Sequence, residues 1–284
     1  MKVTALFPAV FVVLWSSGFI GAKLGLPYAE PATFLLVRFA FVLAILLPLC
    51  WFSRARWPAP RGVAHMAAAG ALMQAGYLGG VFASIAHGMP AGVSALITGL
   101  QPIATAVLSG WLLREHVSRR QWAGLALGLA GVIAVVADRI LVAKLGTAAV
   151  LLSVLALASI TLGTVWQKRH GVGVDLRTGA AIQFLVAAAI IAPFAFIFET
   201  LEVRWTGEFV FALAWLVLVL SLGAIFLLLY LIRHGAASRV ASLFYLVPPS
   251  TALMAWALFG ETYSVAAAFG MGLAMLAVWL VTKS

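Results

Sequence analysis

Apolar stretches of about 20 residues follow one another along almost the whole chain, and this is the length that a helix needs to cross a lipid bilayer. Hydrophobic residues make up 64% of the chain and charged residues 9%, which is more apolar surface than a soluble protein of this length can bury. In lipid these stretches must be helices, because only a helix satisfies its own backbone hydrogen bonds there and barrel strands would alternate at period two. We therefore expect an all-α integral membrane protein with ten transmembrane helices, over residues 3–22, 32–51, 64–86, 91–113, 120–137, 145–166, 178–198, 209–232, 238–259 and 263–281.

The positive charges, which give a net charge of +10, lie in short clusters between the apolar stretches. This distribution is typical of membrane orientation, and it lacks the concentrated basic face that binding to nucleic acid requires. With the N-terminus in the cytoplasm, thirteen lysines and arginines lie inside, and four lie outside: Lys23, Arg139, Lys144 and Arg204. The positive-inside rule therefore predicts that both termini are cytoplasmic. We expect a multi-pass protein of a bacterial-type inner membrane.

A motif in the first half of the chain recurs in the second half, always 146 residues later. The matching pairs are Leu100 and Leu246, Pro102 and Pro248, Thr105 and Thr251, Glu115 and Glu261, and Gly124 and Gly270. A fainter repeat at an offset of 145 relates Lys23 to Lys168 and Phe39 to Phe184. We therefore divide the chain into two repeats of five helices, residues 1–140 and 141–284. Because five is an odd number, the second repeat enters the membrane from the opposite face, which is the inverted repeat of alternating-access transporters.

The chain contains two Leu-x-Pro motifs, and each is followed by a glutamate and a glycine. This pattern resembles that of the EamA branch of the drug/metabolite transporter superfamily. The Trp-Ser-Ser-Gly-Phe stretch at residues 15–19 and the arginine at Arg38 are similar to that family as well. The resemblance covers essentially the whole chain. It implies export of small metabolites, often amino acids and in some members aromatic amino acids, with both termini inside.

Pro102 and Pro248 lie in the middle of predicted helices, where a proline removes one backbone hydrogen bond and clashes with the preceding turn. A freed carbonyl at the membrane midplane is tolerated only against protein or a water-filled cavity, so these positions are candidates for a binding region. A packing kink is the alternative. Glu115 and Glu261 come 13 residues later, about 20 Å along a helix, so they lie at opposite membrane surfaces. Each is interpreted either as a gate or salt-bridged latch, or as a carboxylate that fixes a helix end.

Arg38 is the only cation well inside a predicted helix. A charge near the bilayer centre is costly and is usually paired or functional, so Arg38 is a candidate for the substrate site or a gate. It also lies close enough to Pro31 for its side chain to reach the outer surface by snorkelling. None of the eight acidic residues lies in the middle of a predicted helix. We therefore expect no buried carboxylate that carries a proton, and a facilitator or exchanger instead.

The remaining candidates for a substrate cavity are polar and aromatic residues in the predicted helices. Amides and hydroxyls can hydrogen-bond a zwitterion, and aromatic rings can stack on its side chain, although contacts between helices are the alternative role for any one of them. The cavity candidates are Trp15, Ser16, Arg38, Gln74, Tyr77, Thr98, Gln101, Pro102, Trp166, Tyr230, Ser242, Tyr245 and Pro248. We expect the cavity between the two repeats, lined by the helices at residues 3–22, 64–86, 91–113, 145–166, 209–232 and 238–259.

The function predicted from these features is alternating-access export of small neutral metabolites, with aromatic or hydrophobic amino acids first. Uptake of another metabolite by a facilitator or permease, and drug efflux, are the alternatives. An intramembrane enzyme would need a catalytic motif such as His-Glu-x-x-His or Gly-x-Ser-x-Gly, and the sequence has none, so we expect no catalytic residues, metal or cofactor. The expected partners are a small-molecule substrate and the lipid bilayer, without nucleic acid. The oligomeric state is not specified, and a monomer is compatible with the sequence.

Overall fold

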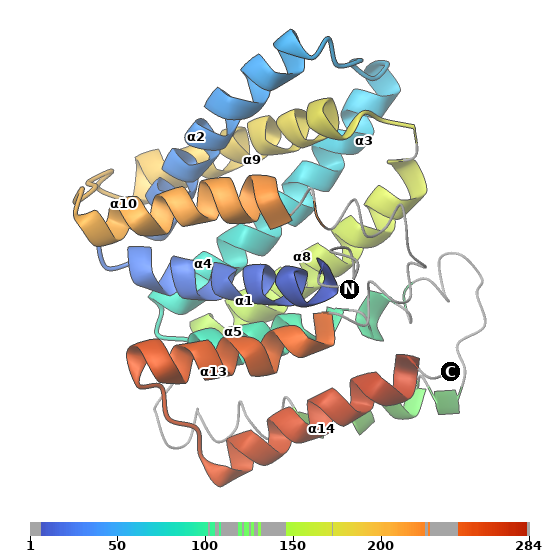
Figure 1. The fold of residues 1–284 in the computed structure, drawn as a ribbon, viewed down its shortest axis with the longest axis vertical. Coiled ribbons are helices and arrows are strands. Elements are labelled where there is room, and N and C mark those ends of the chain that lie inside the picture. The colour runs from blue at the N-terminus through green and yellow to red at the C-terminus, as the bar shows by residue number, and fades with distance from the viewer. Residues whose placement is uncertain are drawn as a thin grey trace.

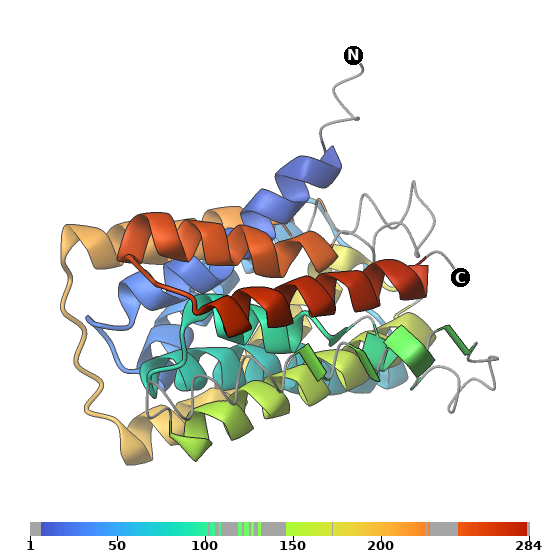
Figure 2. The same cartoon turned by 90° about the horizontal axis from the view of Figure 1, so that it is seen from below.

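The computed structural model of the chain is a bundle of helices that run roughly along one direction (Figures 1 and 2). The structure describes residues 7–101, 103–105, 108, 119–120, 122–124, 126–127, 130–131, 146–171, 173–224, 227 and 244–282. The helices are α1 (Phe7–Gly25), α2 (Pro31–Phe52), α3 (Pro60–Gly70), η2 (Ala71–Gly76), α4 (Tyr77–Ala86), α5 (Ala91–Thr98), α8 (Thr147–His170), α9 (Leu176–Phe198), α10 (Gly207–Ala214), η3 (Trp215–Ala224), η4 (Phe244–Leu246), α13 (Val247–Phe259) and α14 (Val265–Thr282).

Five described helices are long and apolar enough to cross a membrane. They span Pro31–Phe52, Pro60–Ala86, Thr147–His170, Leu176–Phe198 and Gly207–Ala224. Within the described residues the one β pairing is an isolated bridge between Ala29 and Val203, so the predicted all-helical fold is confirmed. Most of the predicted helix at 120–137 lies outside the described residues, and the count of ten stays a prediction.

Two of the long helices begin with a proline, and two of them change from α- to π-helical geometry along their length. Pro31 and Pro60 occupy the first turn of α2 and α3, where the missing N–H would have no partner inside the helix. The predicted start at residue 64 was therefore four residues late. Two long helices change to π-helical geometry along their length, at η2 between α3 and α4 and at η3 after α10. Such π segments often occur at functional sites, because they shift the side chains that follow them around the helix.

The two halves of the chain interleave in the bundle. Helix α2 packs along α9, α4 along α8, and α5 along α13, so each of these contacts joins the first half to the second. Glycines permit the closest approaches, as is common where helices pack in lipid. At Gly70 of α3, for example, an added Cβ would lie 2.5 Å from the Cα of Gln183 on α9.

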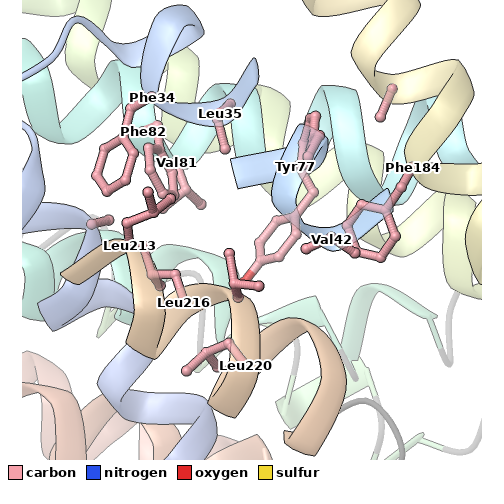
Figure 3. Close-up of a cluster of buried hydrophobic side chains, with 14 of the residues drawn as sticks. Phe34, Leu35, Val42, Tyr77, Val81, Phe82, Phe184, Leu213, Leu216 and Leu220 are labelled. Carbon is pink, nitrogen blue, oxygen red and sulfur yellow. The ribbon is translucent and has the colours of Figure 1, made fainter. Parts of the chain in front are cut away.

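The core between these helices is rich in aromatic rings (Figure 3). Phe34 of α2 contacts Phe82 of α4 and Phe209 of α10, with ring centroids 5.3 and 4.9 Å apart. Phe39 of α2 contacts Phe184 of α9 at 5.6 Å, and these two residues are equivalent in the predicted repeats. In lipid, this packing stabilises the bundle mainly through dispersion contacts and shape complementarity.

The start of α1 and the end of α14 lie at the same end of the bundle in both views, together with the α8–α9 connection (Figures 1 and 2). The connections at residues 26–30, 199–206 and 260–264 lie at the opposite end. These two ends differ in their polar contacts, as described below.

Candidate functional site

A cavity of about 150 Å³ lies inside the bundle. Because one water needs about 15 Å³, there is room for about ten waters or for a small organic molecule. Trp15, Arg38, Gln74 and Tyr77, four of the residues selected from the sequence, lie in its wall. The wall comes from α1, α2, the continuous α3–η2–α4 helix, α8, α9 and η3. Our expectation about the lining helices was thus partly wrong, because α2 and α9 contribute, whereas no described residue of the expected helices at 91–113 and 238–259 lines this cavity.

Arg38 lies on the buried face of α2, with Leu35, Phe39 and Val42 at helical spacing on the same face. Its side chain does not reach the outer surface by snorkelling, since the residue is only 5% exposed. Nε and Nη2 donate to the hydroxyl of Ser221 on η3, at 3.2 and 3.0 Å. The guanidinium lies 6.0 Å from the centre of the Phe82 ring. A hydroxyl and an aromatic face therefore surround the charge, and both are neutral.

Gln74 and Tyr77 lie where η2 meets α4. Gln74 is 8% exposed, and its amide has no hydrogen-bond partner within the described part of the chain. The Tyr77 ring extends from α4 toward Leu220 of η3 (Figure 3). Trp15 of α1 lies in the same wall. The middle of the cavity thus combines two aromatic rings, a free amide and one cation.

Two glutamines that the sequence analysis did not select also lie in this wall. Nε2 of Gln183 on α9 donates to Oε1 of Gln167 on α8 at 3.1 Å. An amide inside the apolar stretch at residues 178–198 is a signal that could have identified Gln183. Its partner depends on how α8 and α9 pack, which the sequence does not specify.

The cavity extends to the α8–α9 connection, where Gly171, Val174 and Asp175 line it. Asp175 accepts from the backbone N–H of Arg177 at 3.0 Å and forms an ion pair with its guanidinium at 2.6 Å. These hydrogen bonds hold the pKa of Asp175 below its ordinary value. We refer to this end of the bundle, which is lined by the 171–175 connection, as the open end.

At the opposite end, polar contacts tie the connections together, and we refer to it as the closed end. The predicted gate residue Glu261 forms an ion pair with Lys23 at the end of α1. It also accepts from the Tyr263 hydroxyl at 2.7 Å and from the Ala91 N–H, at the start of α5, at 3.2 Å. Burial opposes ionisation of Glu261, but the hydrogen bonds from Lys23 and Tyr263 outweigh it and lower its pKa.

A second set of contacts closes the same end between α2 and α9. The Glu199 carboxylate accepts from the backbone N–H groups of Ala32 and Thr33, at 2.8 and 2.7 Å, and so caps the first turn of α2. In return, Glu30 accepts from the N–H and hydroxyl of Thr200 at 2.6 and 2.7 Å. These hydrogen bonds lower the pKa of Glu30.

Thr98 and Gln101 lie beside a smaller cavity of about 20 Å³ that also touches Trp15 and Tyr77. Their polar groups are already used within the protein. The Thr98 hydroxyl donates to the Ser94 carbonyl at 2.9 Å, and the Gln101 amide donates to the Thr164 hydroxyl at 3.0 Å. This space is too small for a metabolite as it stands.

Three other candidates with described side chains, Ser16, Pro248 and Trp166, contact neighbouring helices and are not among the described residues that line the large cavity. Ser16 donates to the carbonyls of Val12 and Val247, at 2.7 and 3.3 Å, and so links α1 to α13. Pro248 is buried against α5, where an added Cβ on Gly99 would lie 2.6 Å from its Cγ.

Trp166 donates from Nε1 to the His65 carbonyl at 3.1 Å and so links α8 to α3. Tyr245 lies in η4, and only its backbone is described. Pro102, Glu115, Tyr230 and Ser242 lie outside the described residues.

Two segments of the chain, residues 3–137 and 147–283, match the model of the EamA-like transporter family. An uncharacterized transporter of Bacillus subtilis (strain 168), YvbV, is 28% identical over 99% of this chain and 92% of its own length. An uncharacterized inner membrane transporter of Escherichia coli (strain K12), YedA, is 28% identical over 98% of this chain and 90% of its own.

A probable amino-acid metabolite efflux pump of Salmonella typhimurium (strain LT2) is 26% identical over 56% of this chain and 51% of its own length. A protein crystal structure superposes with a TM-score of 0.68 at 20% identity, over 98% of this chain and 96% of that one. That likeness concerns the fold alone.

Proposed function

The chain belongs to the EamA-like transporter family and is a multi-pass membrane protein that transports small molecules, and from this premise we propose that it exports amino acids or similar amphiphilic metabolites. We expect substrates with aromatic or hydrophobic side chains to be preferred. The observation that carries this proposal is the cavity, in which the rings of Trp15, Tyr77 and Phe82 face the same space as the Gln74 amide. Such rings contribute contact area to an apolar side chain, while the amide can bind a polar head group.

The contacts at the two ends support an inward-facing state of an alternating-access cycle. By the predicted orientation, Lys23 and the 260–264 connection are outside and the 171–175 connection is cytoplasmic. The cavity extends to the cytoplasmic connection, while the Lys23–Glu261 ion pair joins the helices at the outer end. A substrate would enter this state from the cytoplasm, as export requires.

We assign the alternation to two inverted repeats, residues 1–140 and 141–284. The Phe39–Phe184 contact supports this division, because equivalent residues of two repeats meet where a pseudo-two-fold axis passes between them. The two family matches, 3–137 and 147–283, begin and end near the same boundary. In this scheme the contacts that close one end break as those at the other end form.

Transport is proposed to run by exchange or by facilitated diffusion. Among the described residues, the one acidic side chain that lines the large cavity is Asp175, which lies at its mouth and is paired with Arg177. A carboxylate that gains and loses a proton in each transport cycle would have to lie inside the cavity, away from a cation such as Arg177 that keeps it ionised. Export is further supported by the Salmonella relative, which is described as a probable efflux pump.

Transport into inverted membrane vesicles tests this proposal. Vesicles that contain the protein should accumulate labelled phenylalanine, tryptophan and leucine faster than vesicles without it, and preloading with unlabelled substrate should accelerate uptake. A proton gradient should make little difference. Accumulation only in right-side-out vesicles would reverse the direction, and accumulation of no amino acid would refute the proposed substrate class.

A further inference from the structure

Arg38 is a buried cation on the wall of the large cavity, and it has no acidic partner among the described residues. The two ion pairs found in that part of the chain are Lys23 with Glu261 and Arg177 with Asp175. Asp175, the acidic residue of the same cavity, is therefore engaged at the mouth. A buried charge without a counter-ion is costly, and an arginine cannot escape this cost by losing its proton.

The donors of Arg38 are only partly used. A guanidinium has five N–H donors, and the described contacts use one on Nε and one on Nη2, both of which donate to Ser221. The Phe82 ring compensates part of the charge through its face at 6.0 Å. The remaining donors have no partner within the described residues, while the residue itself lines a space of about 150 Å³. A ligand in that space would meet both a positive charge that is only partly compensated and free donors.

The residues of the cavity wall favour one class of ligand, a carboxylate with a hydrophobic body. A planar guanidinium matches a carboxylate, which it can bind through two parallel hydrogen bonds. One cation balances one negative charge, whereas a phosphate ester would need more cations than the described wall provides. The surrounding side chains, such as Met73, Tyr77 and Val81, are mostly apolar and suit a hydrophobic body attached to the acid.

Among the described residues of the same wall, none is an ionic partner for an ammonium group deep in the cavity. Of its described residues only Asp175 is acidic, and it lies at the mouth. The Gln74 carbonyl can accept a hydrogen bond from an amino group, but this contact between neutral and charged groups adds less than an ion pair. The carboxylate is therefore the group that the site requires, and the amino group is optional.

We propose that Arg38 binds the carboxylate of the cargo, so that the substrates are amphiphilic monocarboxylates with or without an α-amino group. This deepens the proposed function and rests on it for the assumption that the large cavity is the transport site. Amides, esters and decarboxylated amines of the same compounds should be poor ligands. Arg38 would then determine specificity.

Binding to the purified full-length protein in lipid nanodiscs, measured by isothermal titration calorimetry, tests this proposal with two matched pairs. The pairs are 3-phenylpropionate with 3-phenylpropionamide, and L-phenylalanine with L-phenylalaninamide. Each acid should bind about 10- to 100-fold more tightly than its amide, which is the range for a charge-assisted hydrogen bond. Arg38→Gln should remove this difference. Arg61→Gln, which removes an exposed cation of α3, should keep it.

The comparison of acids with amides in the wild-type protein does not depend on whether Arg38→Gln folds. Equal binding of acid and amide would overturn the role of Arg38 and leave export of amphiphilic compounds standing. A third pair, hexanoate and hexanamide, tests the case in which Arg38 binds carboxylates but the substrates are not amino acids. If hexanoate binds more tightly than hexanamide while phenylalanine does not bind, the Arg38 site stands and the proposed amino-acid substrates fail. Binding of no carboxylate at all would overturn the Arg38 proposal.

Discussion

The ion pair between Lys23 and Glu261 gives the sharpest test of how the outer end is closed. Glu261→Gln keeps the size of the side chain and removes its charge. The Glu261 side chain is 8% exposed and Lys23 is 29% exposed, so the pair is partly shielded from water. A hydrogen bond to a charged group contributes about 1.5–3 kcal/mol, and Glu261 accepts from Lys23, Tyr263 and the Ala91 N–H.

If the closed outer end loses about 2 kcal/mol relative to the open one, the ratio of open to closed molecules rises about 30-fold. This change can be measured with a membrane-impermeant maleimide added from outside. The reporter is Ala95→Cys on α5, a fully buried position beside the smaller cavity, in a Cys50→Ala background. In right-side-out vesicles, Glu261→Gln should increase the labelling rate up to this factor.

Asp175→Asn is the matched control, because it also neutralises an ion-paired carboxylate but at the open end. With Asp175→Asn, the rate of Ala95→Cys labelling from outside should be equal to or lower than the rate without it. Equal labelling of wild type and Glu261→Gln would refute the role of this ion pair, and its contacts would then only fix the ends of α1 and α5.

Three further predictions follow from the same geometry. Tyr77→Ala should weaken transport of aromatic substrates more than that of alanine by about 1 kcal/mol, measured as the change in half-saturating concentration, and an equal loss for all substrates would show that the ring only holds helices together. Gly70→Ala should lower the unfolding temperature in detergent, because its Cβ would lie 2.5 Å from α9 and overpacking costs about 1–3 kcal/mol, whereas Gly207→Ala, which has open space around it, should not. The pKa of Glu261 is lowered from its ordinary value of 4.5, so its ion pair should stabilise the closed outer end above that pH and lose this effect as the pH falls further. Because maleimide labelling itself slows as a thiol becomes protonated, the labelling rates of Ala95→Cys with and without Glu261→Gln are compared at each pH. The two rates should converge as Glu261 is protonated, and a ratio that stays constant down to pH 3 would contradict this.

The helices were the most predictable part of this chain. Length and apolarity identify a span, and prolines such as Pro31 and Pro60 mark where two of them begin. The all-helical membrane class followed from these local features alone. The ten-helix count and the orientation remain predictions from charge and repeat patterns.

The rotation of each helix about its axis was much less predictable. The sequence left two interpretations of Arg38, a side chain that snorkels to the outer membrane surface or one that lies in the interior. The hydrogen bond to Ser221 of η3, 183 residues away, places it in the interior. The hydrogen bonds of Ser16 and Trp166 to other helices could not be predicted either. An apolar helix in lipid has no polar face that marks its packed side. The Gln167–Gln183 pair was missed because its contact depends on how α8 and α9 pack, although the Gln183 amide in an apolar stretch was a signal in the sequence.

In the proposed transport cycle the cargo occupies the cavity between α1, α2, α4 and α9. Photo-crosslinking of the full-length protein in nanodiscs with 4-azido-L-phenylalanine, followed by mass spectrometry of the peptides, tests it most directly. Adducts are expected on Trp15, Tyr77 and Gln183, and excess phenylalanine should suppress them. Adducts confined to lipid-facing residues such as Trp256, which is 62% exposed, and unaffected by excess phenylalanine would contradict it.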